Sequence, residues 1–306
     1  MLHILSGKQF ADKNLIDKIF KLANDFELAD KKGEIPQMLS KKIIACIFFE
    51  PSTRTRLSFE SASLRLGAGV ISAENASVNS SSTKGETIED TIKTINCYAD
   101  AIVMRHSENG IVEKASKVSN VPIINAGDGS NQHPTQALLD LYTIKKEKKS
   151  LENLTITFVG DLIYGRTIHS LLELLNNYSN NKFYFVSPKE LSLPAENKKE
   201  LLDKKIQFEE TQNLEEALKN SDVIYMTRVQ KERFKNLADY EKVKDSFLLT
   251  TEHLKYLKKD TIIMHPLPRV NEIDPQIDND PRAAYFRQVK NGLYVRMAIL
   301  VLALGI

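Results

Sequence analysis

The sequence contains no tryptophan and only 2 cysteines, 12 glycines and 10 prolines among 306 residues. Two cysteines cannot form the disulfide framework of a small secreted domain, which favours a reducing compartment. Cys46 lies in a strand-like apolar run and Cys97 in a helix-like one, so we expect two buried free thiols. The N-terminus lacks the apolar core of a signal peptide, and no apolar run reaches the about 20 residues of a membrane span. We therefore expect a cytoplasmic protein that has no membrane partner.

An excess of charge of one sign is also missing. Lys and Arg number 42, Asp and Glu number 40, and the net charge of +2 is spread along the chain. Without a basic arm or stripe, nucleic acid is not an expected partner. The 6 histidines are dispersed and no His/Cys spacing suits zinc, so we expect neither a metal nor a cofactor. The length is typical of about two domains, each large enough for its own core.

Strand-like and helix-like apolar segments alternate along both halves of the chain. Strands are predicted at 43–49, 69–72, 101–104, 121–125, 154–159, 183–186, 206–208, 223–226 and 261–264. Helices are predicted at 14–29, 57–66, 87–98, 111–118, 134–147, 167–176, 196–204, 214–219 and 285–304. This alternation predicts an α/β fold of two doubly wound parallel-sheet domains joined by interdomain helices. The C-terminal helix is expected to pack back on the first domain.

A turn rich in anion-binding groups joins the strand at 43–49 to the following helix. The N-terminus of a helix attracts anions, because its first N–H groups lack helical partners and its dipole is positive there. Hydroxyl groups and guanidinium groups that match phosphate are added by Ser52, Thr53, Arg54, Thr55 and Arg56. The simpler alternative is a Ser/Thr N-cap beside two solvated arginines.

Two further polar residues of the first half fall at the ends of predicted strands. Arg105 follows one strand, and His133 follows a glycine-rich turn after the next. Ligands of open parallel sheets bind beyond the C-terminal ends of the strands, so we expect both residues near the anion turn. A structural histidine that caps a turn is the alternative for His133. The polar loop at 75–85 is long enough to bind a ligand, but a disordered surface loop has the same composition.

The second half repeats this arrangement. Arg166 follows a turn that contains only Gly160 and Gly165, fewer glycines than a dinucleotide site requires, and it can hold a carboxylate. The segment at 227–233 is dense in anion-binding side chains, although a solvated charged loop is an equal alternative. The rigid segment at 265–269 contains two prolines and can present carbonyl groups to an ammonium group.

These segments resemble the aspartate/ornithine carbamoyltransferase family over nearly the whole chain. The turn at 51–56 is similar to the carbamoyl phosphate signature of the family. Six further motifs follow in the family's order, at 84–86, 103–106, 127–136, 160–166, 227–233 and 265–269. Ornithine enzymes typically carry Cys-Leu-Pro where Pro-Leu-Pro stands at 266–268, and they lack the loop at 228–233. The sequence is similar to the aspartate form at both points.

The resemblance implies transfer of the carbamoyl group from carbamoyl phosphate to the α-amine of L-aspartate, an early step of pyrimidine biosynthesis. The domain at 1–134, completed by the helix at 286–306, would bind carbamoyl phosphate, and the domain at 150–285 would bind L-aspartate. Carbamoyl phosphate would contact Ser52, Thr53, Arg54, Thr55, Ser80, Lys84, Arg105, His133 and Gln136. The implied catalytic residues are Arg54, Thr55, Lys84, Arg105 and His133. L-aspartate would contact Lys84, Arg166, Arg228, Gln230, Leu267 and Pro268.

The resemblance also implies a homotrimer whose active sites are shared between neighbours. Ser80 and Lys84 would come from the adjacent subunit, although the serine run at 80–82 lets the loop align in more than one register. The attachment of regulatory chains stays open.

Three alternatives remain at this point. A carbamoyltransferase for another amine would share the phosphate turn. A non-catalytic paralogue would keep the fold but lose charged site residues, which are present here. A nicotinamide-dependent oxidoreductase is disfavoured by the glycine spacing at 160–165.

Overall fold

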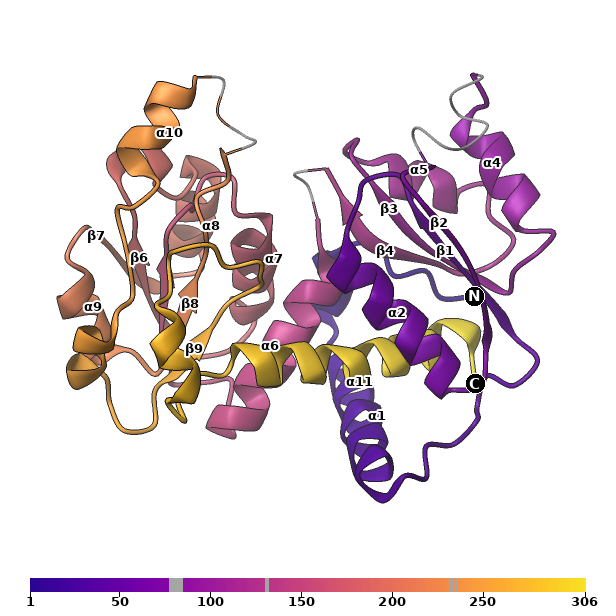
Figure 1. Cartoon of the computed structure of the whole chain (residues 1–306), viewed down its shortest axis with the longest axis horizontal. Helices are drawn as coiled ribbons and strands as arrows, with labels where there is room; N and C mark the ends of the chain where they lie inside the picture. Colours follow the sequence, from indigo (N-terminus) through magenta and orange to yellow (C-terminus); the bar gives the residue numbers. More distant parts are fainter. Residues whose placement is uncertain (77–84, 130–131, 232–233, 235) are drawn as a thin grey trace. The chain divides into compact units, whose positions relative to one another are not determined.

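The computed structural model describes residues 1–76, 85–129, 132–231, 234 and 236–306. Its contacts divide the chain into two compact units (Figure 1). Unit 1 comprises Met1–Tyr142 and Lys290–Ile306, and unit 2 comprises Thr143–Val289. Helices α6 (Pro134–Lys148) and α11 (Tyr285–Leu304) each run from one unit into the other. Within the described part of the chain, no helix is both long and apolar enough to cross a membrane.

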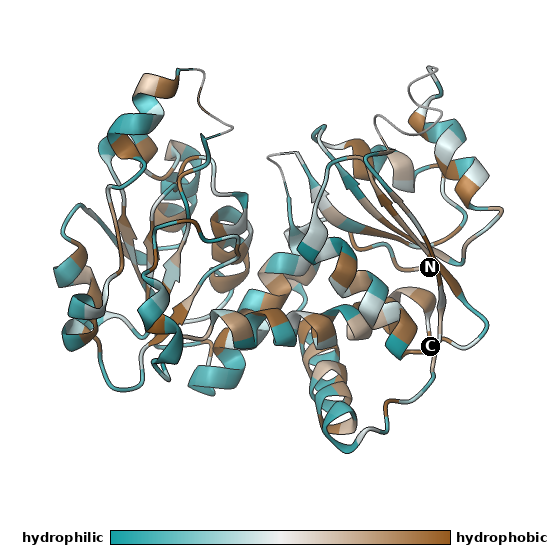
Figure 2. Ribbon diagram, in the orientation of Figure 1, coloured by the Kyte–Doolittle hydropathy of each residue, from teal (hydrophilic) through white to brown (hydrophobic). Residues whose placement is uncertain are grey.

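Unit 1 is built on a parallel sheet of four strands, in the order β2-β1-β3-β4. The strands are β1 (Ile43–Phe48), β2 (Gly69–Glu74), β3 (Ala101–His106) and β4 (Ile123–Asp128). The two central strands β1 and β3 are mostly hydrophobic and almost wholly buried (Figure 2), as expected for a sheet covered on both faces. The edge strand β2 is largely exposed.

The helices of unit 1 begin and end at recognisable signals. They are α1 (Lys13–Lys32), α2 (Thr53–Arg65), α4 (Ile88–Ile95) and α5 (Ile111–Ser116), besides the 3-10 helix η1 (Gly7–Ala11). The Asp12 carboxylate caps α1 by accepting from the Asn14 N–H, and Gly33 ends it at a φ of 73°. Ile16, Ile19, Ala23 and Phe26 of α1 are buried, and they form the packing face of the helix predicted at 14–29.

Unit 2 contains a parallel sheet of five strands, in the order β7-β6-β5-β8-β9. The strands are β5 (Thr155–Val159), β6 (Lys182–Val186), β7 (Gln207–Thr211), β8 (Val223–Met226) and β9 (Ile262–Met264). The helices are α7 (Arg166–Leu175), α8 (Ala195–Asp203), α9 (Leu214–Asn220) and α10 (Leu237–Val243). The 3-10 helices are η3 (Lys189–Leu191), η5 (Thr251–Tyr256) and η6 (Pro275–Asn279). In the core, the rings of Phe158 and Phe185 stack with centroids 5.8 Å apart.

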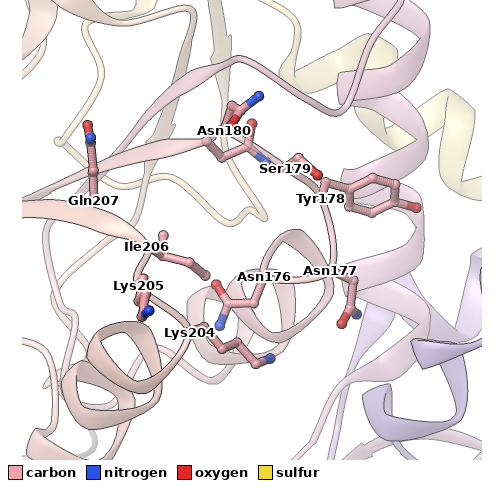
Figure 3. Close-up of a pocket in the computed structure, with 10 residues that line it drawn as sticks. Asn176, Asn177, Tyr178, Ser179, Asn180, Lys204, Lys205, Ile206 and Gln207 are labelled. Atoms are coloured by element: carbon pink, nitrogen blue, oxygen red, sulfur yellow. The ribbon is translucent and has the colours of Figure 1, made fainter.

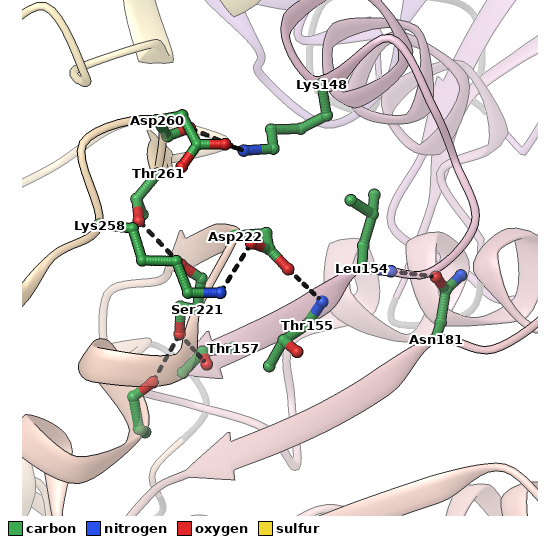
Figure 4. Close-up of polar contacts among 11 residues, drawn as sticks. Lys148, Leu154, Thr155, Thr157, Asn181, Ser221, Asp222, Lys258, Asp260 and Thr261 are labelled. Atoms are coloured by element: carbon green, nitrogen blue, oxygen red, sulfur yellow. Dashed lines mark hydrogen bonds and ion pairs between the residues drawn. The ribbon is translucent and has the colours of Figure 1, made fainter.

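A polar network links β5 to the segments that precede β8 and β9 in unit 2 (Figure 4). The Asp222 carboxylate accepts from the Thr155 N–H and from Lys258 Nζ, both at 2.8 Å. The hydroxyl groups of Thr157 and Ser221 lie 2.5 Å apart, and Thr261 donates to the Ser221 carbonyl at 2.8 Å. These bonds tie the segments before β5, β8 and β9 together, so they set the register of the strands whose far ends carry the site.

The strand order places one topological switch point in each sheet. In unit 1 the chain passes from β1 to β2 on one side and then to β3 on the other, so the switch lies between β1 and β3. In unit 2 it lies between β5 and β8 for the same reason. Ligands of doubly wound sheets bind at the C-terminal ends of the strands at such points.

The predicted fold class is confirmed, with differences in detail. Cys46 is buried as expected, but Cys97 is exposed, because α4 ends at Ile95 and the thiol follows in a turn. The predicted helix at 87–98 is therefore too long. Helix α10 was not predicted from the sequence. Most of the polar loop predicted at 75–85 lies outside the described residues.

Candidate functional site

The turn after β1 leads directly into α2, which begins at Thr53. Ser52 is the N-cap residue, and its carbonyl accepts from the Arg56 N–H at 3.0 Å. Thr53 and Arg54 are exposed and Thr55 is buried. As far as the described residues go, the Ser52 hydroxyl makes no capping bond with α2. The simple Ser/Thr cap is therefore not what this turn forms, and the helix N-terminus keeps its attraction for an anion.

Arg56 differs from the other cations of this turn. Its Nη1 lies 3.0 Å from Glu60 Oε1, and its Nη2 lies 3.0 Å from Glu74 Oε2. Two carboxylates thus share one guanidinium group and hold it between α2 and β2. The expectation that Arg56 offers a guanidinium fork to phosphate is wrong, because those donors are used within the fold.

Arg105 lies at the end of β3, beside the end of β1. Its side chain is buried, and Nη2 lies 3.1 Å from Glu50 Oε2 while Nη1 donates to the Ala126 carbonyl at 3.3 Å. The Arg105 carbonyl accepts from the Phe49 N–H at 2.9 Å. These contacts hold the guanidinium group at the switch point of the unit 1 sheet.

His133 and Arg105 meet at Gly127, near the end of β4. A Cβ atom on Gly127 would lie 2.8 Å from Arg105 Nη1 and 3.6 Å from His133 Cδ2, so both side chains pack against this backbone position. Gly127 has a φ of 119°, which disfavours any other residue. The sequence predicted this convergence, and the structure confirms it for these two residues.

The start of α6 fixes His133 and Gln136. The His133 carbonyl accepts from the N–H groups of Gln136 and Ala137, at 3.0 and 3.1 Å. The Gln136 side chain donates to the buried Asp140 carboxylate at 2.8 Å. Because a carboxylate only accepts, this bond places the Gln136 NH2 group toward Asp140 and leaves the amide oxygen on the other branch.

A buried aspartate at the end of β4 bonds to the segments before α5 and α6. Asp128 Oδ1 accepts from the Gln132 N–H and Oδ2 accepts from the Gly110 N–H, both at 3.0 Å. The Asn125 amide oxygen accepts from the Gly127 N–H at 2.7 Å. Side-chain acceptors thus satisfy N–H groups at the end of β4 and just before α5 and α6.

The candidate site of unit 2 lies at the ends of β5 and β8. A Cβ atom on Gly160 would lie 2.2 Å from the Thr227 carbonyl oxygen, so only glycine lets the two strand ends approach this closely. The Thr227 N–H donates to the Val159 carbonyl at 2.9 Å. This contact places the residues after β8, beginning with Arg228, beside the turn that leads to Arg166.

Tyr164 joins Arg166 to Gln230. The Tyr164 carbonyl accepts from the Arg166 N–H at 2.9 Å and from Gln230 Nε2 at 3.0 Å. The buried Asp161 carboxylate accepts from the N–H groups of Tyr164 and Gln230, at 2.9 and 3.3 Å. The structure therefore brings the predicted residues Arg166, Arg228 and Gln230 together in one loop pair.

The turn after β9 contains Leu267 and Pro268. Leu267 has a φ of 57°, in the left-handed region that a leucine rarely adopts. Its N–H donates to His265 Nδ1 at 2.7 Å, and His265 Nε2 lies 2.6 Å from Glu272 Oε1. Burial acts to raise the pKa of Glu272, but the hydrogen bonds from His265 and the backbone outweigh it and hold that pKa below its usual range.

Two predicted site residues, Ser80 and Lys84, lie outside the described residues. A separate cavity of about 630 Å³ contains none of the predicted site residues (Figure 3). It is lined by residues 176–181 and 204–207, near the starts of β6 and β7, which is the opposite edge of the sheet from Arg166 and Arg228. The cavity is therefore separate from the two loops that contain Arg166, Arg228 and Gln230.

The sequence did not single out four acidic residues that organise these loops: Glu50, Asp128, Asp161 and Glu272. Each lies in or next to a motif that was recognised, but acidic residues are common in loops. Only their contacts distinguish them from solvated charges.

Comparison with known proteins matches both units to one family. A family model described as the carbamoyl-P binding domain of aspartate/ornithine carbamoyltransferase matches residues 2–146, and its Asp/Orn binding domain matches residues 152–303. The chain belongs to the aspartate/ornithine carbamoyltransferase family. Matches of this extent leave no part of either sheet outside the family, and they confirm the resemblance found in the motifs.

Several carbamoyltransferase relatives are similar over nearly their full length. The aspartate carbamoyltransferase catalytic subunit of Clostridium kluyveri is 50% identical over 304 residues, which is 99% of this chain and 98% of the relative. The catalytic subunit of M. jannaschii aspartate transcarbamoylase is 49% identical, with a TM-score of 0.91 over 98% of this chain and 97% of that one. Trypanosoma cruzi aspartate transcarbamoylase, solved with carbamoyl phosphate and aspartate, is 39% identical, with a TM-score of 0.91 over 97% and 95%.

Proposed function

We propose that this chain transfers the carbamoyl group of carbamoyl phosphate to the α-amine of L-aspartate. The products are N-carbamoyl-L-aspartate and phosphate. The observation that carries the proposal is the presence of arginine at both switch points, with Arg105 beside His133 in unit 1 and Arg166 and Arg228 in unit 2. Each switch point suits one anionic substrate. The names of the relatives, and the carbamoyl phosphate and aspartate bound in the Trypanosoma cruzi enzyme, support the same reaction.

Carbamoyl phosphate is assigned to the first domain, residues 1–134 completed by the helix at 286–306. The phosphate group binds the N-terminus of α2, whose hydroxyl and guanidinium groups come from Ser52, Thr53, Arg54 and Thr55. The carbamoyl oxygen faces donors from Thr55, Arg105 and His133. The Gln136 amide oxygen accepts from the carbamoyl NH2 group, because its own NH2 group is held by Asp140.

L-aspartate is assigned to the second domain, residues 150–285. Arg166, Arg228 and Gln230 bind its carboxylates, and the carbonyl groups of Leu267 and Pro268 accept from its amine. Backbone carbonyls suit this task, since they bind an amine without adding a charge that would repel the carboxylates.

The reaction needs no nucleophilic side chain of the protein. The aspartate nitrogen attacks the carbamoyl carbon, and the carbonyl oxygen gains negative charge that the Arg105 and His133 side chains stabilise. The bond from carbon to the phosphate oxygen then breaks, and the departing phosphate takes the proton released by the amine. Positioning of two anions beside fixed cations supplies most of the catalysis.

The assembly is proposed as a homotrimer with shared active sites. Ser80 and Lys84 reach the carbamoyl phosphate of the adjacent subunit, and Lys84 also contacts L-aspartate. The enzyme acts in the cytoplasm in pyrimidine biosynthesis. Regulatory chains are a proposed further partner, in keeping with the description of relatives as catalytic subunits.

The experiment supplies carbamoyl phosphate with L-aspartate and with L-ornithine in parallel, and a reaction without protein corrects for spontaneous decay. We expect carbamoyl aspartate and no citrulline. Citrulline alone would overturn the assignment of the second substrate but keep the carbamoyl phosphate site. If neither product forms, the chain is better interpreted as a non-catalytic paralogue.

A further inference from the structure

His265 bridges three parts of unit 2 from a buried position, with 1% of its surface exposed. Its main-chain N–H donates to the Gln288 side-chain oxygen at 3.0 Å. Its ring accepts from the Leu267 N–H through Nδ1 at 2.7 Å, and Nε2 lies 2.6 Å from Glu272 Oε1. The ring therefore connects a carboxylate to the backbone of the turn assigned to L-aspartate.

These contacts fix the proton on the ring. A ring nitrogen that accepts from an N–H group carries no hydrogen, so Nδ1 of His265 is unprotonated. Nε2 then carries the ring hydrogen and donates it to the Glu272 carboxylate. The other oxygen of Glu272 accepts from the N–H groups of Val270 and Asn271, both at 3.1 Å. The acceptor role of Nδ1 thus makes the imidazole neutral, and the Glu272 carboxylate, which accepts from three donors, fixes the orientation of the ring.

The contacts of His265 help to hold the backbone conformation of Leu267. A leucine in the left-handed region is less stable than in the usual regions, and such a conformation persists only where its surroundings hold it. The hydrogen bond from the Leu267 N–H to His265 is one such restraint, made by a buried side chain that is itself restrained by Glu272. Loss of the ring acceptor releases this restraint and leaves the N–H without its partner.

We propose that His265, oriented by Glu272, is a positioning residue for L-aspartate that keeps the Leu267 carbonyl in place to accept from the substrate amine. The inference rests on the proposed function of the Leu267 turn. His265 does not touch the substrate and acts through the backbone of Leu267.

Two substitutions distinguish the roles of the two ring nitrogens of His265. In His265→Asn the amide oxygen takes the place of Nδ1 and keeps the acceptor for Leu267. In His265→Gln the terminal amide takes the place of Nε2, which keeps a donor for Glu272 and removes the acceptor for Leu267. Both variants lose the ring, so a role in packing alone affects them alike.

We expect His265→Gln to raise the KM for L-aspartate about tenfold. The Kd for inorganic phosphate should stay within about twofold in both variants, and His265→Asn should keep a KM within about threefold of wild type. His253→Gln is the matched control, since His253 Nδ1 accepts from the Thr250 N–H at 3.0 Å in the same unit but outside the site. Its KM should not change.

Equal rises of KM in the two His265 variants, or an unchanged KM in His265→Gln, overturn the inference. A parallel loss of phosphate affinity also overturns it, because that points to general damage. If His265→Gln does not fold, Glu272→Gln takes its place, and it should raise the same KM by releasing the ring. A wild-type chain that makes no carbamoyl aspartate refutes the proposed function instead, so the two failures are distinguishable.

Discussion

The guanidinium group of Arg105 and the carboxylate of Glu50 lie 3.1 Å apart at the ends of the adjacent strands β3 and β1. Both groups sit at the switch point of unit 1, where an anion is expected to bind. In the proposed site the carboxylate competes with carbamoyl phosphate for the Arg105 donors, and its charge also repels the phosphate group. We therefore expect the carboxylate of Glu50 to weaken phosphate binding.

Replacement of Glu50 should tighten phosphate binding. Glu50→Gln keeps the size of the side chain and removes its charge, so we expect inorganic phosphate to bind about three- to tenfold more tightly. Calorimetric titration of phosphate at low ionic strength measures this change. The control is Glu74→Gln, which removes a carboxylate bound to Arg56 instead of Arg105. An unchanged or weaker affinity in Glu50→Gln would contradict the competition.

Loss of Arg105 should damage catalysis more than any change to its partner. Arg105→Ala removes a donor that the proposed mechanism places at the developing oxyanion, a loss that typically costs about 3 to 4 kcal/mol, or about two hundred- to a thousandfold in kcat. Steady-state kinetics with saturating substrates measure the effect. Arg65→Ala is the control, because Arg65 makes an exposed ion pair with Asp30 at the other end of α2. Near-normal turnover in Arg105→Ala would reject its catalytic assignment.

The two thiols should differ sharply in reactivity. Cys97 is exposed, whereas burial raises the pKa of the Cys46 thiol to about 12. A thiol reagent at neutral pH should therefore modify Cys97 in the native protein and reach Cys46 only after unfolding. Cys97→Ser is the matched variant, and it should be unreactive until unfolded. Rapid modification of Cys46 in the native state would contradict its burial.

The raised pKa of the Cys46 thiol also makes the stability of the fold depend on pH. The folded pKa of Cys46 lies above the ordinary value of 9.0, so folding favours the protonated thiol. This contribution is fully present below pH 9, and it is lost as the pH rises toward 12. A Cys46→Ala variant should accordingly lose less stability than wild type over that range, which denaturant titrations at several pH values can measure.

The alternation of strands and helices and the residues at the strand ends were predictable because they are local properties. Apolar periodicity identified the strands, and parallel sheets collect functional residues at the C-terminal ends of strands. Arg105, His133 and Arg166 were found in this way. The same local reasoning failed at Cys97, since the end of α4 at Ile95 depends on a boundary that periodicity does not define.

Pairing between distant segments was not predictable. Hydropathy does not tell which strands are neighbours, so the adjacency of β1 with β3 and of β5 with β8 came only from the structure. The bond from the Gln230 N–H to Asp161 joins residues 69 positions apart, and neither local sequence predicts it. The role of Arg56 was mistaken for a related reason, because its partner Glu74 lies on β2, 18 positions further along the chain.

Arg228 should affect the two substrates unequally. It follows β8 in unit 2, beside Arg166, and the carbamoyl phosphate groups of the proposed site belong to the first domain. Arg228→Ala should therefore raise the KM for L-aspartate at least about a hundredfold, while the Kd for carbamoyl phosphate stays within about threefold. Lys231→Ala, in the same loop, tests the effect of charge alone. Equal losses for both substrates would contradict the division of labour between the domains.

Mixed subunits test the proposed sharing of active sites. Arg54 belongs to the turn of its own subunit, whereas Lys84 is proposed to reach the site of its neighbour. Arg54→Ala and Lys84→Ala should each be nearly inactive alone, because every site of each homotrimer lacks the same side chain. After exchange of subunits, a hybrid trimer contains a site that takes Arg54 from one variant and Lys84 from the other, so partial activity should return.

Arg54→Ala mixed with Arg105→Ala is the control, since both residues belong to the same subunit's half of the site and no hybrid restores them together. Activity that stays absent in the first mixture, with exchange verified by mass, would place Lys84 in the site of its own subunit.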